Sequence, residues 1–168
     1  DRHDTFDWYL QLGSLKHVNE KHLHGKIPTW NDYVAHPDYD AFWQAQTITP
    51  QLQSCTVPTL NVGGWWDQED FFGPLAIYQA LEKHDTQRHN HLVVGPWNHG
   101  GWSRGDGDKL GAITFGSKTA LWFREQVQAV WFRHWLKDQG RLDLPEALTF
   151  EAGSNEWRRW DSWPPTSS

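Results

Sequence analysis

Two short apolar segments, at residues 57–64 and 91–95, constrain the fold of this chain more than any other feature. Neither alternates between apolar and polar side chains, which is typical of strands buried on both faces. A helical pattern follows the first segment at 72–84. A longer one follows the second at 117–138, where Gly140 fits the helix end. The order strand, helix, strand, helix predicts an α/β fold with a parallel sheet covered on both faces.

The residues before the first apolar segment carry no strand signal. We expect a short helix at 6–15, a loop at 16–26, and two further short helices at 29–35 and 39–46, with Thr29 as an N-cap. The chain therefore opens with a helical region.

The pattern changes again after the long helix. Residues 147–152 and 156–160 alternate in the manner of strands, and Gly153-Ser154-Asn155 between them has the composition of a turn. We expect these residues to form a β-hairpin.

Charge and composition exclude several classes of protein. The formal net charge is −6 and no basic stripe indicates nucleic-acid binding. No run of 18 apolar residues predicts a membrane span. Cys55 is the single cysteine, so an internal disulfide is impossible, and we expect a packed thiol. Because the chain begins at Asp1 and contains no Met, we expect its native start, and any signal peptide, to lie upstream.

Tryptophan is unusually frequent, at 13 of 168 residues. Its large apolar ring and N–H donor suit a crowded core, an aromatic pocket, or a face on which sugars or bases stack. Trp65, Trp66 and Trp97 flank Asp67 and His99, the candidate site residues described next. They would shape a substrate pocket if those loops form a site, and would belong to the core otherwise.

Each of the two apolar segments runs into a loop with a residue suited to proton transfer. Asp67 follows the first strand and His99 follows the second. The carboxyl ends of parallel strands meet at one sheet edge, where catalytic groups collect. A carboxylate there can orient a histidine, in the chain order of the last two members of a Ser…Asp…His triad. Separately, each residue could equally be an ordinary turn or loop residue.

Glu69 and Asp70 lie just before the helix at 72–84. Two acids at a helix start complement the helix dipole, and this alone would explain them. They could also form an anionic pocket that holds a substrate ammonium group, since neighbouring carboxylates favour a cation between them.

Other reactive side chains fit their patterns less well. Ser103, in Gly101-Trp102-Ser103-Arg104-Gly105, matches the G-x-S-x-G motif, but glycine-rich loop flanks it and it follows the histidine. We do not expect it to be the nucleophile. Two H-x-H pairs lack carboxylate partners and are expected to be polar loop residues: His22 with His24, and His89 with His91.

The strings Asp-Gln-Glu-Asp at 67–70 and Gly-Pro-Trp-Asn-His-Gly-Gly at 95–101 resemble the α-amino acid ester hydrolases. These enzymes belong to the wider group of X-Pro dipeptidyl-peptidases and cocaine esterase. The likeness covers nearly the whole chain, and the string at 67–70 is its specific part. It implies an α/β-hydrolase domain, a helical cap and a C-terminal jelly roll. Residues 1–56 would end the cap, 57–140 would be the C-terminal part of the hydrolase domain, and 141–168 would begin the jelly roll.

The resemblance also implies roles for single residues. Asp67 would be the triad acid and His99 the triad base, while Glu69 and Asp70 would hold the α-ammonium group of the substrate. The nucleophilic serine, the oxyanion hole and a third ammonium-binding carboxylate would lie upstream of Asp1, so the chain by itself is expected to be inactive. No cofactor or metal is expected.

The parent enzyme would then cleave and synthesise esters and amides of α-amino acids, including acyl transfer to β-lactam nuclei. The resemblance further implies a homo-oligomer in the periplasm or outside the cell. An X-Pro dipeptidyl-peptidase or plain esterase would share the triad and use Glu69 and Asp70 only as helix-start acids. A tryptophan-rich carbohydrate-binding module would instead show exposed rings in a row and no contact between Asp67 and His99.

Overall fold

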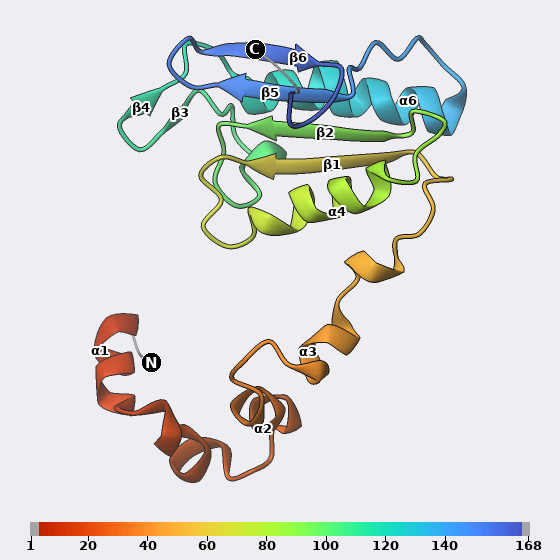
Figure 1. Ribbon diagram of the computed structural model, residues 1–168. Helices are drawn as coiled ribbons and strands as arrows, with labels where there is room; N and C mark the ends of the chain where they lie inside the picture. Colours follow the sequence, from red (N-terminus) through yellow and green to blue (C-terminus); the bar gives the residue numbers. More distant parts are fainter. Residues whose placement is uncertain (1–3, 166–168) are drawn as a thin grey trace. The chain divides into compact units, whose positions relative to one another are not determined.

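The computed structural model describes residues 4–165, which fall into two compact units, one ending at Thr47 and one beginning at Ile48 (Figure 1). Residues 1–3 and 166–168, the outermost parts of the first and third expected domains, lie outside the described residues. Each unit is described by itself.

The first unit is helical, as the sequence predicts. Its elements are α1 (Thr5–Leu12), the 3-10 turn η1 (Leu15–His17), the π-helical turn η2 (Asn19–Leu23), α2 (Pro28–Ala35) and α3 (Ala41–Gln46). The expected loop at 16–26 is wrong, because η1 and η2 occupy most of it. Thr29 is not the N-cap of α2, because Pro28 already fills the first turn, where its fixed φ and missing N–H are tolerated.

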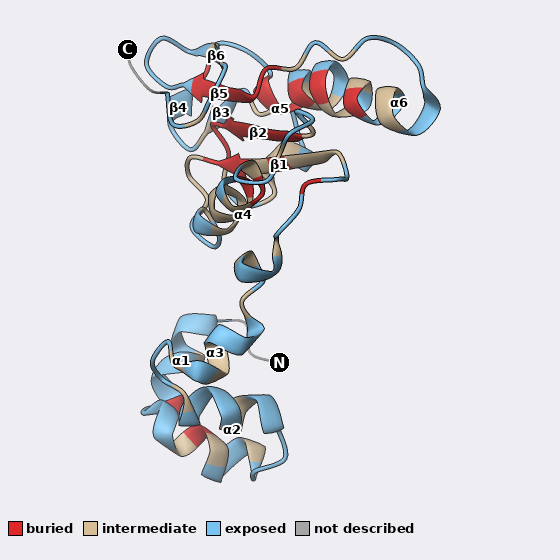
Figure 2. Cartoon of the chain, turned by 45° about the vertical axis from the view of Figure 1, so that its right-hand side comes forward, coloured by how far each residue is buried: buried red, intermediate tan, exposed pale blue. Residues whose placement is uncertain are grey.

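Local polar contacts organise this unit. The Asp40 side chain caps α3 by accepting from the Phe42 N–H at 2.9 Å, and it lies 2.6 Å from Nδ1 of His36. The Trp43 indole donates to the His36 carbonyl at 2.7 Å. Leu12 and Val18 are the buried hydrophobic residues that the structure describes here, and most of the surface is exposed (Figure 2). Caps and turns thus supply the polar contacts within this unit.

The second unit is built on a four-stranded sheet in the order β1-β2-β5-β6 (Figure 1). Its strands are β1 (Thr59–Gly64), β2 (Asn90–Gly95), β5 (Ala147–Glu151) and β6 (Glu156–Trp160). The first three are parallel, which confirms the expectation for β1 and β2. The sheet is mixed rather than parallel throughout, because β6 turns back antiparallel to β5 in the expected hairpin.

Helices connect the parallel strands. After the 3-10 turn η3 (Thr49–Gln51) and β1, helix α4 (Phe72–Glu82) leads to β2. The expected long helix is confirmed as one continuous segment of α5 (Thr119–Trp122), the π-helical η5 (Phe123–Gln128) and α6 (Ala129–Lys137). Before it lie the 3-10 turn η4 (Gly101–Ser103) and a small hairpin of β3 (Lys109–Leu110) and β4 (Ile113–Thr114). Within residues 4–165 no helix has the length and apolar character to span a membrane.

Side chains of β2 alternate between two apolar clusters, one on each face of the sheet. Val93 packs with Phe123 and Val127 of the long helical segment. Leu92 and Val94 pack with Tyr78 of α4. All six residues of β2 are buried, and Figure 2 shows this strand at the centre of the unit. The non-alternating apolar pattern in the sequence thus reflects helices on both faces.

The three-part division expected from the sequence, with boundaries after residues 56 and 140, remains a prediction. Contacts between residues place a boundary at Thr47 instead of residue 56. Strand β5 pairs with β2, so the sheet continues through the part expected to begin a jelly roll, residues 141–168.

A buried polar network lies where β2 begins. Asn61 donates to the Asn90 side chain at 2.9 Å, and Asn90 donates in turn to Glu82 at 2.9 Å. The Tyr78 hydroxyl donates to Glu146 at 2.9 Å. Burial, and next the neighbouring Glu82 carboxylate, raise the pKa of Glu146 to about 7. Glu146 is only 6% exposed, so its protonated form is favoured in the folded protein.

This network predicts that Glu146→Gln changes how stability depends on pH. The pKa of the carboxyl group rises on folding from an ordinary value of 4.5 to about 7. Its contribution to stability is therefore complete below pH 4.5 and is lost as the pH rises through 7. Glutamine resembles the protonated acid and does not ionise, so the variant should exceed the natural protein in stability at pH 8. Urea unfolding midpoints at pH 5 and pH 8 measure the effect.

The exposed Glu156, changed to Gln in the same way, is the matched control and should leave the pH dependence as it is. An unaltered pH dependence in Glu146→Gln would contradict the assignment of a proton to this carboxyl.

Candidate active site

Two loops leave the sheet side by side at the carboxyl ends of β1 and β2. Gly64 pairs with Gly95 at the last position of the parallel register. Beyond it, the Trp66 N–H donates to the Trp97 carbonyl at 3.0 Å. A Cβ atom on Gly64 would lie 2.2 Å from that carbonyl oxygen, so glycine is required for the close approach. The strand pairing thus continues into the loops and sets the distance between their side chains.

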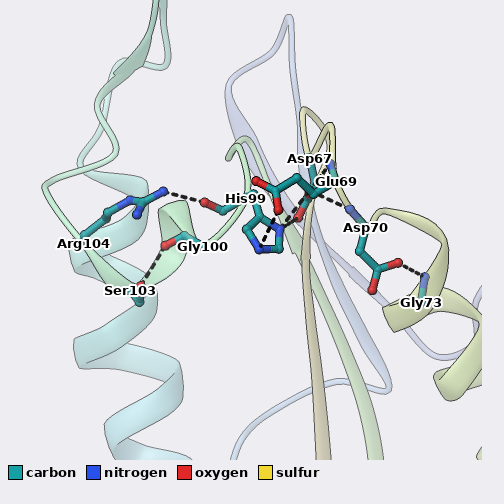
Figure 3. Close-up of polar contacts among 8 residues, drawn as sticks. All are labelled: Asp67, Glu69, Asp70, Gly73, His99, Gly100, Ser103 and Arg104. Carbon is teal, nitrogen blue, oxygen red and sulfur yellow. Dashed lines mark hydrogen bonds and ion pairs between the residues drawn. The ribbon is translucent and has the colours of Figure 1, made fainter. Parts of the chain in front are cut away.

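The first loop presents Asp67 to His99 on the second (Figure 3). Both carboxylate oxygens lie 3.1 Å from Nδ1 of His99. The Asp67 side chain is 2% exposed, whereas His99 is 46% exposed. A half-exposed imidazole held by a buried carboxylate has its second nitrogen available for a partner. The expected contact between the two residues is present.

Backbone donors keep the Asp67 carboxylate ionised. Desolvation opposes its charge, but the N–H groups of Asp70 and Glu69, at 3.0 and 2.9 Å, together with His99, lower the pKa of Asp67 below its usual range. An ionised carboxylate can only accept hydrogen bonds, so the proton between the two side chains belongs to His99 Nδ1. The neutral imidazole then carries its lone pair on Nε2, the atom that a general base needs.

Glu69 and Asp70 occupy different environments. A carboxylate oxygen of Glu69 lies 3.6 Å from Nε2 of His99, and the side chain is 63% exposed. Asp70 accepts from the Gly73 N–H at 2.7 Å in the first turn of α4, as a helix-start acid does. Figure 3 shows Glu69 above the imidazole and Asp70 directed toward the helix. The role of both residues in substrate binding remains a prediction.

The two tryptophans also differ. Trp97 is 2% exposed and packs in the apolar cluster between the sheet and the long helical segment, so its ring belongs to the core, one of the two alternatives left open. Trp66 is half-buried, and the centroid of its ring lies 5.8 Å from that of Phe115. As a candidate pocket wall, Trp66 is the better placed of the pair.

Ser103 lies in the 3-10 turn η4 and donates to the Gly100 carbonyl at 2.7 Å (Figure 3). It has neither the strand before it nor the helix after it that a nucleophilic serine of this motif requires. Cys55 is buried, as expected. Among residues 4–165 no group of three or more His, Cys, Asp and Glu side chains could hold a metal ion.

Several residues that support the site carry no local sequence signal. The Trp97 indole donates to the hydroxyl of Thr119 at 3.0 Å, and that hydroxyl donates to the Gly107 carbonyl at 2.6 Å. Arg104 and Arg124 donate to carbonyls of the His99 loop. Arg104 belongs to the loop itself, whereas Thr119 and Arg124 reach it only through the crossover from β2 to the long helical segment. Because these two residues are each 22 positions from their partners, no local pattern in the sequence identifies them.

The chain is similar to several known proteins. The model of the X-Pro dipeptidyl-peptidase (S15) family matches residues 2–101. The chain belongs to this family. Cocaine esterase from Rhodococcus sp. (strain MB1 Bresler) is a relative that is 31% identical over 157 residues, which are 90% of this chain and 26% of the esterase.

Two solved structures extend the similarity to most of the fold. An aminopeptidase from the marine sediment archaeon Thaumarchaeota archaeon is 40% identical with a TM-score of 0.88, covering 99% of this chain and 28% of its own. A selenomethionine-labelled α-amino acid ester hydrolase is 35% identical with a TM-score of 0.87, covering 98% and 27%. The chain spans about a quarter of the length of these relatives. The relatives are hydrolases, as the resemblance in the sequence predicts.

The buried bonds of Thr119 predict a specific loss of stability. Thr119→Val keeps the shape of the side chain but leaves the Trp97 indole N–H without its partner, so we expect a loss of about 1–3 kcal/mol in the free energy of unfolding. Thr119→Ser keeps the hydroxyl and should lose about 0.8 kcal/mol for its missing methyl group. Urea denaturation of the complete protein measures both values. A Thr119→Val variant as stable as the natural protein would show that the hydroxyl contributes nothing.

Proposed function

We propose that the complete protein is a serine hydrolase and acyltransferase that acts on esters and amides of α-amino acids. The hydrogen bond between Asp67 and His99 carries this proposal, because it orients an accessible imidazole at the sheet edge. The nucleophilic serine would come from a part of the protein outside this chain. Asp67 and His99 would complete its triad.

The chemistry follows from the state of the imidazole. With Nδ1–H bound to Asp67, Nε2 of His99 takes the proton of the serine hydroxyl as its oxygen attacks the substrate carbonyl. His99 then gives this proton to the leaving alcohol or amine, and an acyl-enzyme remains. Water, activated by the same nitrogen, releases the acid. An amine such as a β-lactam nucleus, taking the place of water, receives the acyl group instead.

Glu69 and Asp70 would select substrates that carry a free α-amino group. Glu69 is the stronger candidate, because its exposed carboxylate lies 3.6 Å from Nε2 of His99 and thus next to the reacting bond. An ammonium group between such carboxylates and the triad would hold the neighbouring carbonyl near the serine. The names of both solved relatives, an aminopeptidase and an α-amino acid ester hydrolase, refer to amino-acid substrates and support this selection.

An X-Pro dipeptidyl-peptidase or a general esterase is the second candidate. The family model and the relationship to cocaine esterase favour it, and it would use the same triad. The hydrogen bond from Gly73 to Asp70 fits the purely structural role that this alternative gives to the acids. A carbohydrate-binding module is disfavoured, since its expected separation of Asp67 from His99 is not observed.

We further propose that the helical first unit belongs to a cap, that β1, β2 and their helices belong to an α/β-hydrolase core, and that the residues after 140 lead into a jelly roll. The helices on both faces of the sheet and the match to the α-amino acid ester hydrolase support the hydrolase core.

The proposed role of His99 predicts that His99→Ala abolishes turnover. Losing the general base should lower kcat at least about 10³-fold, because the serine hydroxyl then has no acceptor for its proton. Hydrolysis of an α-amino acid 4-nitrophenyl ester by the complete protein measures the loss. His134→Ala, which removes a histidine at the end of α6, is the matched control and should retain full activity. A His99→Ala enzyme with normal kcat would refute the triad.

The proposed role of Glu69 predicts a loss that depends on the substrate. Glu69→Gln removes the charge that would bind the ammonium group, so kcat/KM for an α-amino ester should fall about 10- to 100-fold. The same ester without its amino group should be hydrolysed as before. The comparison of the two esters is the measurement, and Glu156→Gln on β6 is the control. Equal losses on both esters would exclude the ammonium pocket and leave the triad intact.

A further inference from the structure

The loop that carries His99 has little regular structure of its own. Between β2 and β3 it contains one 3-10 turn, Gly101–Ser103. Gly100, Gly105 and Gly107 adopt φ angles of 68°, 57° and 69°, in the left-handed region that glycine tolerates. Such a segment lacks the repeated hydrogen bonds of a helix or strand. Groups from other parts of the fold can therefore add to the few bonds within the loop, such as that from the Gly101 N–H to the Asn98 carbonyl at 2.9 Å.

Arg124 supplies two of these groups. It lies in η5, the π-helical part of the long segment, and is half-buried. Nη1 donates to the Trp102 carbonyl at 3.1 Å, and Nη2 donates to the Gly105 carbonyl at 2.7 Å. One planar guanidinium group thus bridges two carbonyls on either side of Ser103. Charge-assisted bonds from a rigid fork restrict both distance and direction.

The bridge reaches His99 through the loop itself. The ring of Trp102 meets the imidazole edge-on, with centroids 6.5 Å apart and planes inclined at 71°. At the other end, Arg104 donates to the carbonyl of His99 at 2.6 Å, as Figure 3 shows. Two guanidinium groups therefore hold three carbonyls between His99 and Gly105. A shift of Trp102 would remove one wall beside the imidazole.

We infer that Arg124 is a positioning residue for His99. It binds the loop at Trp102 and Gly105, so that the imidazole stays against Asp67 with Nε2 presented to the serine. Arg124 acts through the loop and contributes no atom to the reaction. This inference rests on the proposed function of His99. It extends the site to a residue 25 positions later in the chain, on a different element.

Kinetics of Arg124 variants of the complete protein test the inference. Arg124→Ala should lower kcat for an α-amino acid 4-nitrophenyl ester about 10- to 100-fold, since small displacements of a catalytic group are costly. KM should change less than about twofold, because the substrate-binding carboxylates are untouched. Esters with and without the amino group should lose kcat equally. The kcat of Arg124→Lys should lie between those of the natural enzyme and Arg124→Ala, because lysine keeps the charge but lacks the planar, two-pronged guanidinium group.

Chemical rescue separates positioning from a general effect on folding. Millimolar guanidinium ion should restore part of the kcat of Arg124→Ala and none of that of His99→Ala. Arg133→Ala is the matched control, because Arg133 lies on the same helical segment and, among residues 4–165, donates to the Ala129 carbonyl of that segment at 3.2 Å and to no residue of the His99 loop. It should retain full kcat.

Two outcomes would overturn the inference. One is an Arg124→Ala enzyme with the kcat of the Arg133→Ala control. The other is a loss of kcat in Arg124→Ala that equals the fraction of unfolded enzyme and is not reversed by guanidinium ion. Failure of the proposed function looks different, because His99→Ala itself would then be active. An inactive His99→Ala beside a fully active Arg124→Ala would remove only the positioning role.

Discussion

The pairing of β1 with β2 is the constraint on which the rest of the site depends. The parallel register ends at Gly64 and Gly95, and the bond from Trp66 to the Trp97 carbonyl carries it one step further. The positions of the loop residues that follow, including Asp67 and His99, depend on this register. A side chain on Gly64 would collide with the Trp97 carbonyl and separate the loops. The missing side chain at Gly64 thus allows the loops that carry Asp67 and His99 to lie next to each other.

Carboxyl groups at the two ends of the sheet have pKa values that are shifted in opposite directions. Where β2 begins, Glu146 is buried beside Glu82, and its carboxyl keeps its proton to near neutral pH. At the carboxyl ends, the Asp67 side chain is also shielded from solvent, but it receives backbone N–H bonds that favour its charge. Burial alone therefore does not decide ionisation. The local donors do, and they leave a charged acceptor only where His99 needs one.

Much of the site could be predicted from the sequence, because the ends of apolar strands are easy to recognise. The apolar segments before Asp67 and His99 predict adjacent parallel strands, and adjacency predicts the contact that the structure shows. The different environments of Glu69 and Asp70 could not be predicted from the sequence. They depend on a turn in which Asp67 accepts two N–H bonds and Asp70 accepts the Gly73 N–H in the first turn of α4. The sequence shows two neighbouring acidic residues but not the direction in which each side chain points.

By itself, the sequence determined the order of elements, the covering of the central strand on both faces, and the two loops that hold Asp67 and His99. These features depend on periodicity and on strand ends, which are local properties of the chain. Only the tertiary structure decided that Trp97 is a core residue, that β5 joins β2, and that Thr119 and Arg124 support the His99 loop. Those contacts join residues far apart in sequence. Their formation depends on how the long helical segment packs against the sheet, which no local pattern records.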